Sequence, residues 1–393
     1  METGGGVTMN LDGQTSQDHG DGPSPVVSVI MANYRGARYL SVSMQAVLAQ
    51  SERRLELIVA DDASDDDSVA IARSLARTDP RVRVIASARN GGPGVTRNLA
   101  LDAARGDWIA VVDSDDLIHP QRLSRLIEAA TDAGADIVAD DLVFFGAAEQ
   151  AGGRTLLQGL QLASPMPLTL DLWLRGNAPG ADLPSFGYLK PVIRRSVLGR
   201  RRYDPTLRIG EDYDLVLRLL IDGATFLLLP DPLYAYRRHA GSVSHRLSVE
   251  TVEAMLAAHD ALPTIADPVA RRTARTMGRD LRNALRYERL VADIKARRVG
   301  AVLPRLVQPE MLRRLAGSVI DRRRRKAAET GATPPAADMA APPQMPPPGS
   351  DWPVAPAASA ALVAARASRG EPPGLAADAP DWAAWLARAA SPD

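Results

Sequence analysis

Short apolar runs recur along the N-terminal part of the chain, and they predict buried strands. Each run is short enough for one strand and apolar enough to be buried on both faces of a sheet. The expected strands are Val26–Met31, Leu55–Ala60, Val82–Ala86, Trp108–Val112 and Ile137–Phe145, and Phe226–Leu229 has the same character further along the chain.

Apolar residues at helical spacing lie between these runs. The expected helix faces are Leu40, Met44, Val47 and Leu48; Val69, Ala72 and Ala76; Val95, Leu99 and Ala103; and Leu123, Leu126 and Ile127. Ser64 or Asp65 is the expected N-cap of the second helix, and Pro120 is expected to open the fourth. Strands that alternate with helices favour an α/β fold with a Rossmann-like, mostly parallel sheet.

The pattern changes along the chain, and it defines the expected regions. Residues 1–25 are rich in Gly, Asp and Ser and are expected to form a disordered leader. Residues 26–245 form the α/β domain, with halves at 26–145 and 146–245, and residues 246–326 show helical periodicity without a strand signal. Residues 327–393 combine a Pro- and Ala-rich linker with a short tail.

Charge and cysteine content exclude several classes of function. The 393-residue chain has 47 Lys and Arg residues against 47 Asp and Glu residues, so no overall positive field indicates a nucleic-acid partner. The absence of cysteine excludes disulfides, thiolate zinc sites and cysteine nucleophiles. The leader lacks the features of a secretory signal, and no apolar run approaches the roughly 18 residues of a spanning helix. We therefore expect a cytoplasmic protein whose membrane contact is at most peripheral.

Acidic residues gather where the expected strands end. Asp113-Ser114-Asp115-Asp116 follows the fourth strand, and open α/β sheets bind ligands at the carboxyl ends of their strands. Carboxylates this close repel one another unless a cation shares them, and hard oxygen ligands suit Mg²⁺ or Mn²⁺ bound together with substrate phosphates. The alternative is that Asp115 or Asp116 only caps the next helix.

Other polar residues are expected at the same edge of the sheet. Asn33 and Tyr34 follow the first strand, and Asp62 follows the second, where it can accept a hydrogen bond from a nucleobase imide. The glycine-rich segment 91–94 precedes a helix that carries Arg97, and the two can hold a diphosphate or form an ordinary turn. No G-x-G-x-x-G or Walker motif follows the first strand, which argues against nicotinamide and P-loop sites.

Two further candidates lie downstream. Glu211-Asp212 precedes a helical segment, where a carboxylate is either an N-cap or a general base. His239 lies in a polar stretch and is either a metal ligand or an ordinary loop histidine.

Together these segments resemble the family 2 glycosyltransferases, which have the GT-A fold. The matching segments are Val27–Tyr34, Ile58–Ser64, Gly94–Asn98, Asp113–Asp116 and Gly210–Asp212, in the family's order. Gly187–Arg195 and Leu207–Asp214 are similar to bacterial exopolysaccharide glucosyltransferases of the succinoglycan type. Two departures concern Ala32, where the family often has Pro before the tyrosine, and Ala63, where Gly is usual.

The resemblance implies roles for the residues of both halves. Nucleotide-sugar binding is implied for Asn33, Tyr34, Asp62, Arg97, Asp113 and Glu211, with Asp62 holding a uracil-like base. Asp115 is implied as the direct metal ligand, with Asp113 in support and His239 as a lesser candidate. Asp212 resembles the catalytic base of inverting members.

The resemblance also implies a reaction. A hexose, expected to be glucose, would pass from a UDP-sugar to a hydroxyl of a growing, lipid-linked exopolysaccharide or other cell-surface glycan. GDP-mannose, UDP-GlcNAc or UDP-galactose as donor, lipopolysaccharide or capsule as acceptor, and a non-catalytic nucleotide-sugar-binding subunit stay open. Val26–Gly36 lacks the signature of a nucleotidyltransferase. The basic runs Arg200–Arg202 and Arg322–Lys326 are either contacts for anionic headgroups or solvated surface.

Overall fold

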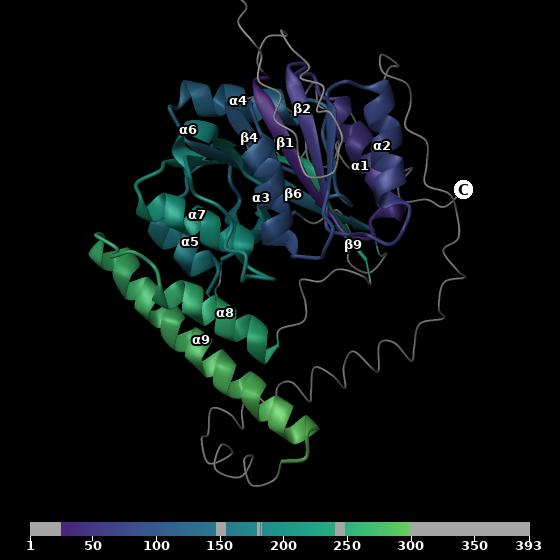
Figure 1. The fold of residues 1–393 in the computed structure, drawn as a ribbon. Coiled ribbons are helices and arrows are strands. Elements are labelled where there is room, and N and C mark those ends of the chain that lie inside the picture. Colours follow the sequence, from purple (N-terminus) through teal and green to yellow (C-terminus); the bar gives the residue numbers. More distant parts are fainter. Residues whose placement is uncertain (1–24, 147–154, 179–180, 182, 240–247, 299–393) are drawn as a thin grey trace, which may run out of the picture.

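The computed structural model describes residues 25–146, 155–178, 181, 183–239 and 248–298, and its strands form one sheet (Figure 1). The strands are β1 (Val27–Asn33), β2 (Leu55–Asp61), β3 (Val82–Ala86), β4 (Trp108–Val111), β5 (Leu117–Ile118), β6 (Ile137–Gly146), β7 (Met166–Pro167), β8 (Val192–Arg194) and β9 (Phe226–Arg238). Within the described residues their order is β3-β2-β1-β4-β8-β6-β9-β5, and β7 also pairs with β9.

The longer strands pair in parallel, which confirms the predicted mostly parallel sheet. β1 pairs in parallel with β2 and β4, β2 with β3, and β6 with β9. The short strands β5, β7 and β8 add antiparallel pairs, and β8 lies between β4 and β6. The carboxyl ends of β1, β2 and β4 therefore lie at one edge, as expected for a ligand-binding α/β sheet.

Helices cover both faces of this sheet. One core contains α1 (Ala37–Leu48), α2 (Ser68–Thr78) and α4 (Arg122–Asp132). The other contains α3 (Pro93–Ala103), α5 (Leu170–Gly176), α6 (Arg195–Leu198) and α7 (Glu211–Ile221). Short 3₁₀ turns lie at Gln158–Leu160 and Phe186–Tyr188.

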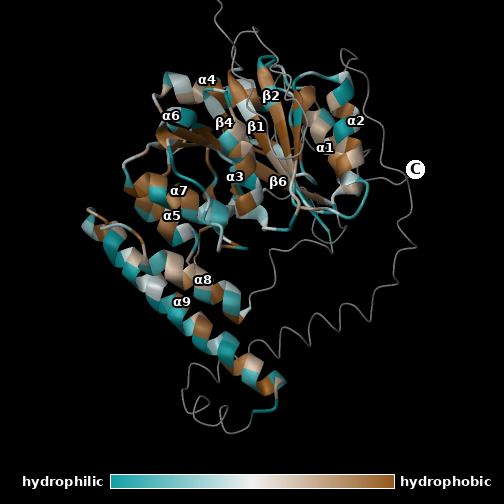
Figure 2. Ribbon diagram, in the orientation of Figure 1, coloured by the Kyte–Doolittle hydropathy of each residue, from teal (hydrophilic) through white to brown (hydrophobic). Residues whose placement is uncertain are grey.

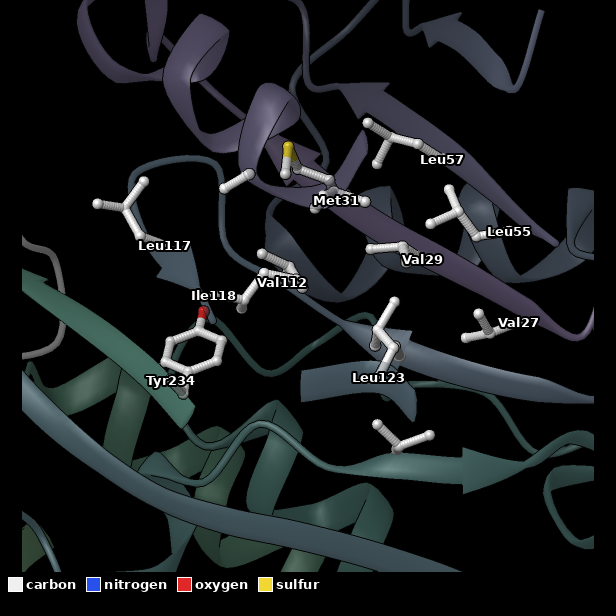
Figure 3. Close-up of a cluster of buried hydrophobic side chains, with 14 of the residues drawn as sticks. Val27, Val29, Met31, Leu55, Leu57, Val112, Leu117, Ile118, Leu123 and Tyr234 are labelled. Atoms are coloured by element: carbon white, nitrogen blue, oxygen red, sulfur yellow. The ribbon is translucent and has the colours of Figure 1, made fainter. Parts of the chain in front are cut away.

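The apolar run of β1 is divided between the two cores. Val27, Val29 and Met31 belong to the core under α1 and α4, while Ile30 belongs to the core on the opposite face. Figure 3 shows the first three beside Leu55 and Leu57 of β2 and Leu123 of α4. Successive side chains of a strand point to opposite faces, so a continuous apolar run indicates a strand buried on both.

The predicted starts of two helices are wrong. α2 begins at Ser68 with Asp67 as N-cap, because Ser64 is hydrogen-bonded to Asp61 and Asp65 is paired with Arg35. α4 begins at Arg122 with Gln121 as N-cap, so Pro120 precedes the helix instead of opening it. The backbone carbonyl of Pro120 instead accepts a hydrogen bond from the backbone N–H of Ser51.

β9 is longer than the apolar run that predicted it. Pro230 and Pro232 interrupt the run after Leu229, but the strand continues to Arg238. Its partner β6 absorbs the interruption through register shifts between Ala139 and Leu142. Bulges of this kind occur beside active sites, where they redirect side chains.

Two further helices, α8 (Val249–Asp260) and α9 (Pro268–Lys295), pack against each other and extend along one side of the body (Figure 1). α9 also packs against α5, and Asp267 caps it by accepting hydrogen bonds from the N–H groups of Val269 and Ala270. These helices confirm the helical periodicity predicted up to residue 298. No helix of the described residues is both long and apolar enough to cross a membrane. The tail from residue 327 and all but the last residue of the leader lie outside the described residues.

Candidate active site

Polar side chains join the carboxyl ends of β1 and β2. Asn33 and Asp61 are partners in the strand register, and Asn33 Nδ2 donates a hydrogen bond to Asp61 Oδ2 at 2.7 Å. The carboxylate of Asp61 also accepts hydrogen bonds from the backbone N–H and the hydroxyl of Ser64. A side chain at Gly36 would bring Cβ to 2.1 Å from Asn33 Oδ1, so only glycine fits there. Asn33 is thus a buried link within the edge that sequence analysis assigned to the nucleoside.

The turn after β2 has the backbone geometry that favours glycine. Ala63 has φ of 58°, in the left-handed region where an L side chain crowds the following carbonyl. Alanine at this position, where the family usually has glycine, therefore adopts a left-handed backbone at a cost in strain.

Asp62 anchors the glycine-rich segment. Its Oδ1 accepts a hydrogen bond from the N–H of Gly91 at 2.7 Å, and its Oδ2 accepts one from the N–H of Gly92 at 2.9 Å. Gly92 has φ of 90°, and a Cβ there would lie 2.6 Å from the Arg208 guanidinium. Asp62 as a whole is only 4% exposed, and its contact with a nucleobase stays a prediction.

Tyr34, unlike the buried Asn33 and Asp62, is exposed, with 49% of its surface accessible. The Arg35 guanidinium lies 5.2 Å from the centre of its ring, and Arg35 itself is paired with Asp65. The ring therefore offers an open aromatic surface at the end of β1, where a nucleobase could stack.

Arg97 is the centre of a buried ion network. Its Nη1 donates to Glu211 Oε1 at 2.5 Å and lies 3.5 Å from Asp212 Oδ1. Its Nη2 donates to Asp113 Oδ1 at 2.8 Å. The arginine comes from α3, Asp113 from the end of β4, and the other two carboxylates from the first turn of α7. The structure thus brings together four of the predicted site residues, and it places Arg97 on carboxylates, with only 5% of its surface exposed.

Lys190 is a fifth member of this network, and sequence reasoning did not assign it a role. Its Nζ lies 2.8 Å from Asp113 Oδ2 and 3.0 Å from Asp212 Oδ2. The Arg122 guanidinium, buried in an ion pair with Asp140 at 2.7 Å, donates to the Lys190 carbonyl and holds this segment. The only signal in the sequence was a single cation inside the apolar stretch 188–193.

Burial and charge act in opposite directions on these groups. Burial would raise the pKa of Asp113, but Lys190 and Arg97 hold it well below its usual value. Burial would lower the pKa of Lys190, but Asp113 and Asp212 raise it well above its usual value. Burial raises the pKa of Glu211 despite the nearby Arg97. The contact between Asp113 and Lys190 is therefore an ion pair at neutral pH.

Asp115 and His239 face each other beside the network. His239 Nε2 lies 2.9 Å from Asp115 Oδ2, and the two side chains are 27% and 32% exposed. The His239 ring also packs on Tyr39, with ring centres 5.4 Å apart. The end of β9 thus brings the predicted lesser metal candidate to the predicted direct ligand, across 124 residues of sequence.

Asp116 is structural, and the prediction that it caps a helix is wrong. It is 1% exposed, accepts a hydrogen bond from the Tyr234 hydroxyl at 2.7 Å, and accepts another from the N–H of Arg237 at 2.7 Å. Burial, together with the charges of Asp115 and Asp113, raises its pKa well above the usual value. Asp116 therefore fixes the acidic loop to β9.

The donor atoms fit a hard divalent cation that is completed by substrate. No group of three or more His, Asp or Glu side chains within the described ranges is arranged to hold a metal by itself. Asp115 and His239 present one oxygen and one nitrogen side by side, and Mg²⁺ or Mn²⁺ commonly takes its remaining ligands from phosphates and water. Both oxygens of Asp113 are bound to cations, so Asp113 becomes available only if one of those contacts opens.

Comparison with known sequences gives these residues a family context. The sequence model described as glycosyl transferase family 2 matches residues 28–196. The chain is 36% identical over 305 residues to the succinoglycan biosynthesis protein ExoO of Rhizobium meliloti, which covers 76% of this chain and 86% of that protein. It is 34% identical over 228 residues to ExoU of the same organism, which covers 56% of this chain and 65% of that protein.

Solved structures show the same fold at lower identity. A fragment of S. aureus TarS in complex with UDP-GlcNAc has a TM-score of 0.53 at 20% identity, over 65% of this chain and 71% of that chain. The complex of the same protein with UDP has a TM-score of 0.51 at 19% identity, over 65% and 70%. The predicted GT-A fold is confirmed, and the chain is an enzyme that belongs to the family 2 glycosyltransferases.

Proposed function

We propose that this enzyme transfers a hexose, with glucose as the first candidate, from a UDP-sugar to a hydroxyl of a growing bacterial exopolysaccharide. The observation that carries the proposal is the carboxylate of Asp212, held at the start of α7 by Lys190 at 3.0 Å and Arg97 at 3.5 Å. A fixed carboxylate at the ligand-binding edge of the sheet suits a general base.

In the proposed reaction Asp212 takes the proton of the acceptor hydroxyl. The hydroxyl oxygen forms its bond to the anomeric carbon as the bond from that carbon to the diphosphate oxygen breaks, and UDP leaves with the electron pair. Attack from the face opposite the leaving group inverts the configuration. Arg97 and Lys190 keep Asp212 oriented and supply fixed positive charge where negative charge develops.

Binding of the donor is proposed for the edge formed by β1, β2 and β4. Tyr34 offers an exposed ring to the base, and the buried Asn33 and Asp62 hold the backbone at the ends of β1 and β2. A divalent cation held by Asp115 and His239, with Asp113, would neutralise charge on the departing diphosphate.

The names and bound ligands of related proteins support the proposed classes of donor and acceptor. ExoO and ExoU are named for succinoglycan biosynthesis, and TarS was solved with UDP and with UDP-GlcNAc. We therefore propose a UDP-sugar donor, a lipid-linked glycan acceptor, and action at the inner face of the plasma membrane. GDP-mannose, UDP-GlcNAc and UDP-galactose are the competing donors, and a non-catalytic sugar-nucleotide subunit is the competing function.

A donor panel tests the proposal. The purified chain is incubated with each of these sugar nucleotides and UDP-glucose, with a lipid-linked acceptor extract, and with Mg²⁺, Mn²⁺ or chelator. The Asp212→Asn variant should bind UDP-glucose normally but lose transfer by a factor on the order of a thousand. Asp222→Asn, at the other end of α7, is the matched control and should transfer normally. Transfer that survives in Asp212→Asn would show that Asp212 is not the base.

A further inference from the structure

Helix α9 carries a row of exposed arginines. We define the α9 arginine stripe as Arg271, Arg272, Arg275, Arg279, Arg282, Arg286 and Arg289, all of which are exposed. At about 100° of rotation per residue, they fall within a sector of about 100° on one side of the helix. The helix as a whole carries eight basic residues and three acidic ones, although the full chain is balanced.

Within the described part of the chain, most arginines of this stripe form no ion pair with a carboxylate. Arg282 pairs with Asp260 and Arg289 with Glu253, both on α8. For the other five arginines, no ion pair occurs with any residue that the structure describes. By contrast, Arg201 pairs with Asp222 and Arg202 with Asp102, so the run suspected from the sequence, Arg200–Arg202, is largely engaged with the protein. The other suspected run, Arg322–Lys326, lies outside the described residues.

Exposed apolar side chains border the stripe. Among the described residues, three large apolar side chains are exposed, and two of them, Val269 at 59% and Ile294 at 42%, lie at the two ends of α9. On the helical wheel they fall within about 60° of the edge of the arginine sector. The buried residues Ala274 and Met277 fall on the other side of the helical wheel, while the buried Leu290 and Asp293 fall within the range of the arginine sector near the end of α9. Figure 2 shows hydrophilic residues along most of α9. A basic row bordered by apolar side chains fits the headgroup region of a bilayer better than a nucleic acid, which gains nothing from the valine and isoleucine.

The stripe belongs to an element that contacts the candidate site. The Tyr213 hydroxyl of α7 lies 2.9 Å from Met277 Sδ of α9, and Tyr213 directly follows Asp212. A Cβ at Gly210, the residue before α7, would lie 3.7 Å from Met255 of α8. A bound surface that restrains α9 would therefore also restrain the first turn of α7, which contacts α8 and α9.

We propose that the α9 arginine stripe docks this enzyme on an anionic phospholipid bilayer, with α9 parallel to the membrane plane and Val269 and Ile294 among the lipid headgroups. The inference rests on the membrane location in the proposed function, but its test requires no glycosyl transfer, so failure to bind vesicles is distinguishable from failure of the proposed reaction. Its physical basis is the attraction of each arginine to anionic headgroups, added to the burial of the two apolar side chains.

Vesicle sedimentation tests the proposal with the full chain and without donor or acceptor. We expect binding to vesicles of phosphatidylcholine with phosphatidylglycerol, and little binding to phosphatidylcholine alone. The triple variant R272Q/R275Q/R279Q should bind the anionic vesicles roughly a hundredfold more weakly, since each surface arginine contributes about a factor of five. The matched control R53Q/R73Q/R77Q removes the same charge from exposed positions, two on α2 and one just before β2, and α2 lies away from α9 in Figure 1. It should bind as the wild type does.

Three results would overturn the proposal. The first is an α9 triple variant that keeps wild-type binding while circular dichroism shows it folded. The second is a loss of binding in the matched control, or in a chain neutralised only at Arg322–Arg325, that equals the loss in the α9 variant. The third is wild-type vesicle affinity in V269S/I294S, which would point to a general polyanion surface instead of a bilayer contact.

Discussion

The ammonium of Lys190 donates a hydrogen bond to Oδ2 of Asp212 at 3.0 Å, which ties the chain before β8 to the first turn of α7. The same ammonium lies 2.8 Å from Asp113 Oδ2. One cation thus keeps the proposed base and the first residue of the acidic loop at a fixed separation. Without it, both carboxylates would depend on Arg97 alone for positive charge.

Removal of this cation should destabilise the fold. Lys190→Met keeps the length of the side chain but leaves buried carboxylates short of a partner, and we expect the free energy of unfolding to fall by about 3–5 kcal/mol. Urea denaturation followed by circular dichroism measures the change. Lys295→Met, at an exposed position of α9, should stay within about 0.5 kcal/mol of the wild type. Equal midpoints for the two variants would contradict a structural role for the Lys190 charge.

Substitution of the two adjacent carboxylates Asp115 and Asp116 should have different effects, one on transfer activity and the other on stability. Asp116→Ala removes the acceptor for Tyr234 and Arg237, and should lower the free energy of unfolding by about 1–3 kcal/mol. Asp115→Ala removes a partly exposed carboxylate that contacts His239, and should leave stability nearly unchanged while transfer falls by about a hundredfold or more. Thermal melts and turnover on the same samples measure both. A wild-type rate of transfer in the Asp115→Ala variant would exclude Asp115 as the metal ligand.

The turn after β2 should gain from a glycine. Ala63 has φ of 58°, and Ala63→Gly removes the clash of its Cβ while adding freedom to the unfolded chain. We expect a net increase in unfolding free energy of about 0.5–1 kcal/mol. Ala133→Gly, at φ of −83° after α4, is the control and should destabilise by a similar amount. If both variants lose stability, the left-handed turn at Ala63 is not strained.

Stability should depend on pH through Asp141. Burial raises its pKa to about 6, although hydrogen bonds from Thr155, Leu157 and Leu142 oppose the shift. A carboxyl whose pKa is raised on folding favours the folded state fully at acidic pH and loses that contribution as pH rises through about 6. The loss is roughly 3 kcal/mol and falls between about pH 4 and pH 6.

Asp141→Asn should remove this dependence, because Oδ1 already accepts both backbone hydrogen bonds and an amide oxygen can replace it. The free energies of unfolding of the two proteins, measured at pH 4, 5, 6 and 7, should agree near pH 4, diverge between pH 4 and pH 6, and differ by a constant amount above pH 6, with the variant more stable. If the difference in unfolding free energy between the two proteins were the same at every pH from 4 to 7, Asp141 would not titrate in that range.

Much of the fold was predictable from sequence because its signals are local. The continuous apolar runs of β1, β2 and β4 mark strands buried on both faces, and the polar residues at their ends mark the binding edge. Helix starts were predicted less well. Ser64 and Asp65 look like caps in sequence, but Asp61 and Arg35 bind them, and these partners come from tertiary contacts.

The candidate site was only partly predictable for the same reason. Asp113, Asp115, Arg97 and Asp212 are visible as motif positions, while Lys190 is a single cation without a motif around it. Asp115 and Asp116 are adjacent and chemically identical, yet one faces His239 and the other is buried under Tyr234. Their difference depends on the path of β9, more than a hundred residues downstream.

The sequence by itself therefore determined the main strands and helices, and which carboxylates follow the ends of buried strands, because apolar periodicity depends on residues that are neighbours along the chain. Only the tertiary structure decided which of those carboxylates is paired with a cation, which is buried and which stays open to a ligand. Those properties depend on distance through space, as the contact between Asp113 and Lys190 does across 77 residues of chain.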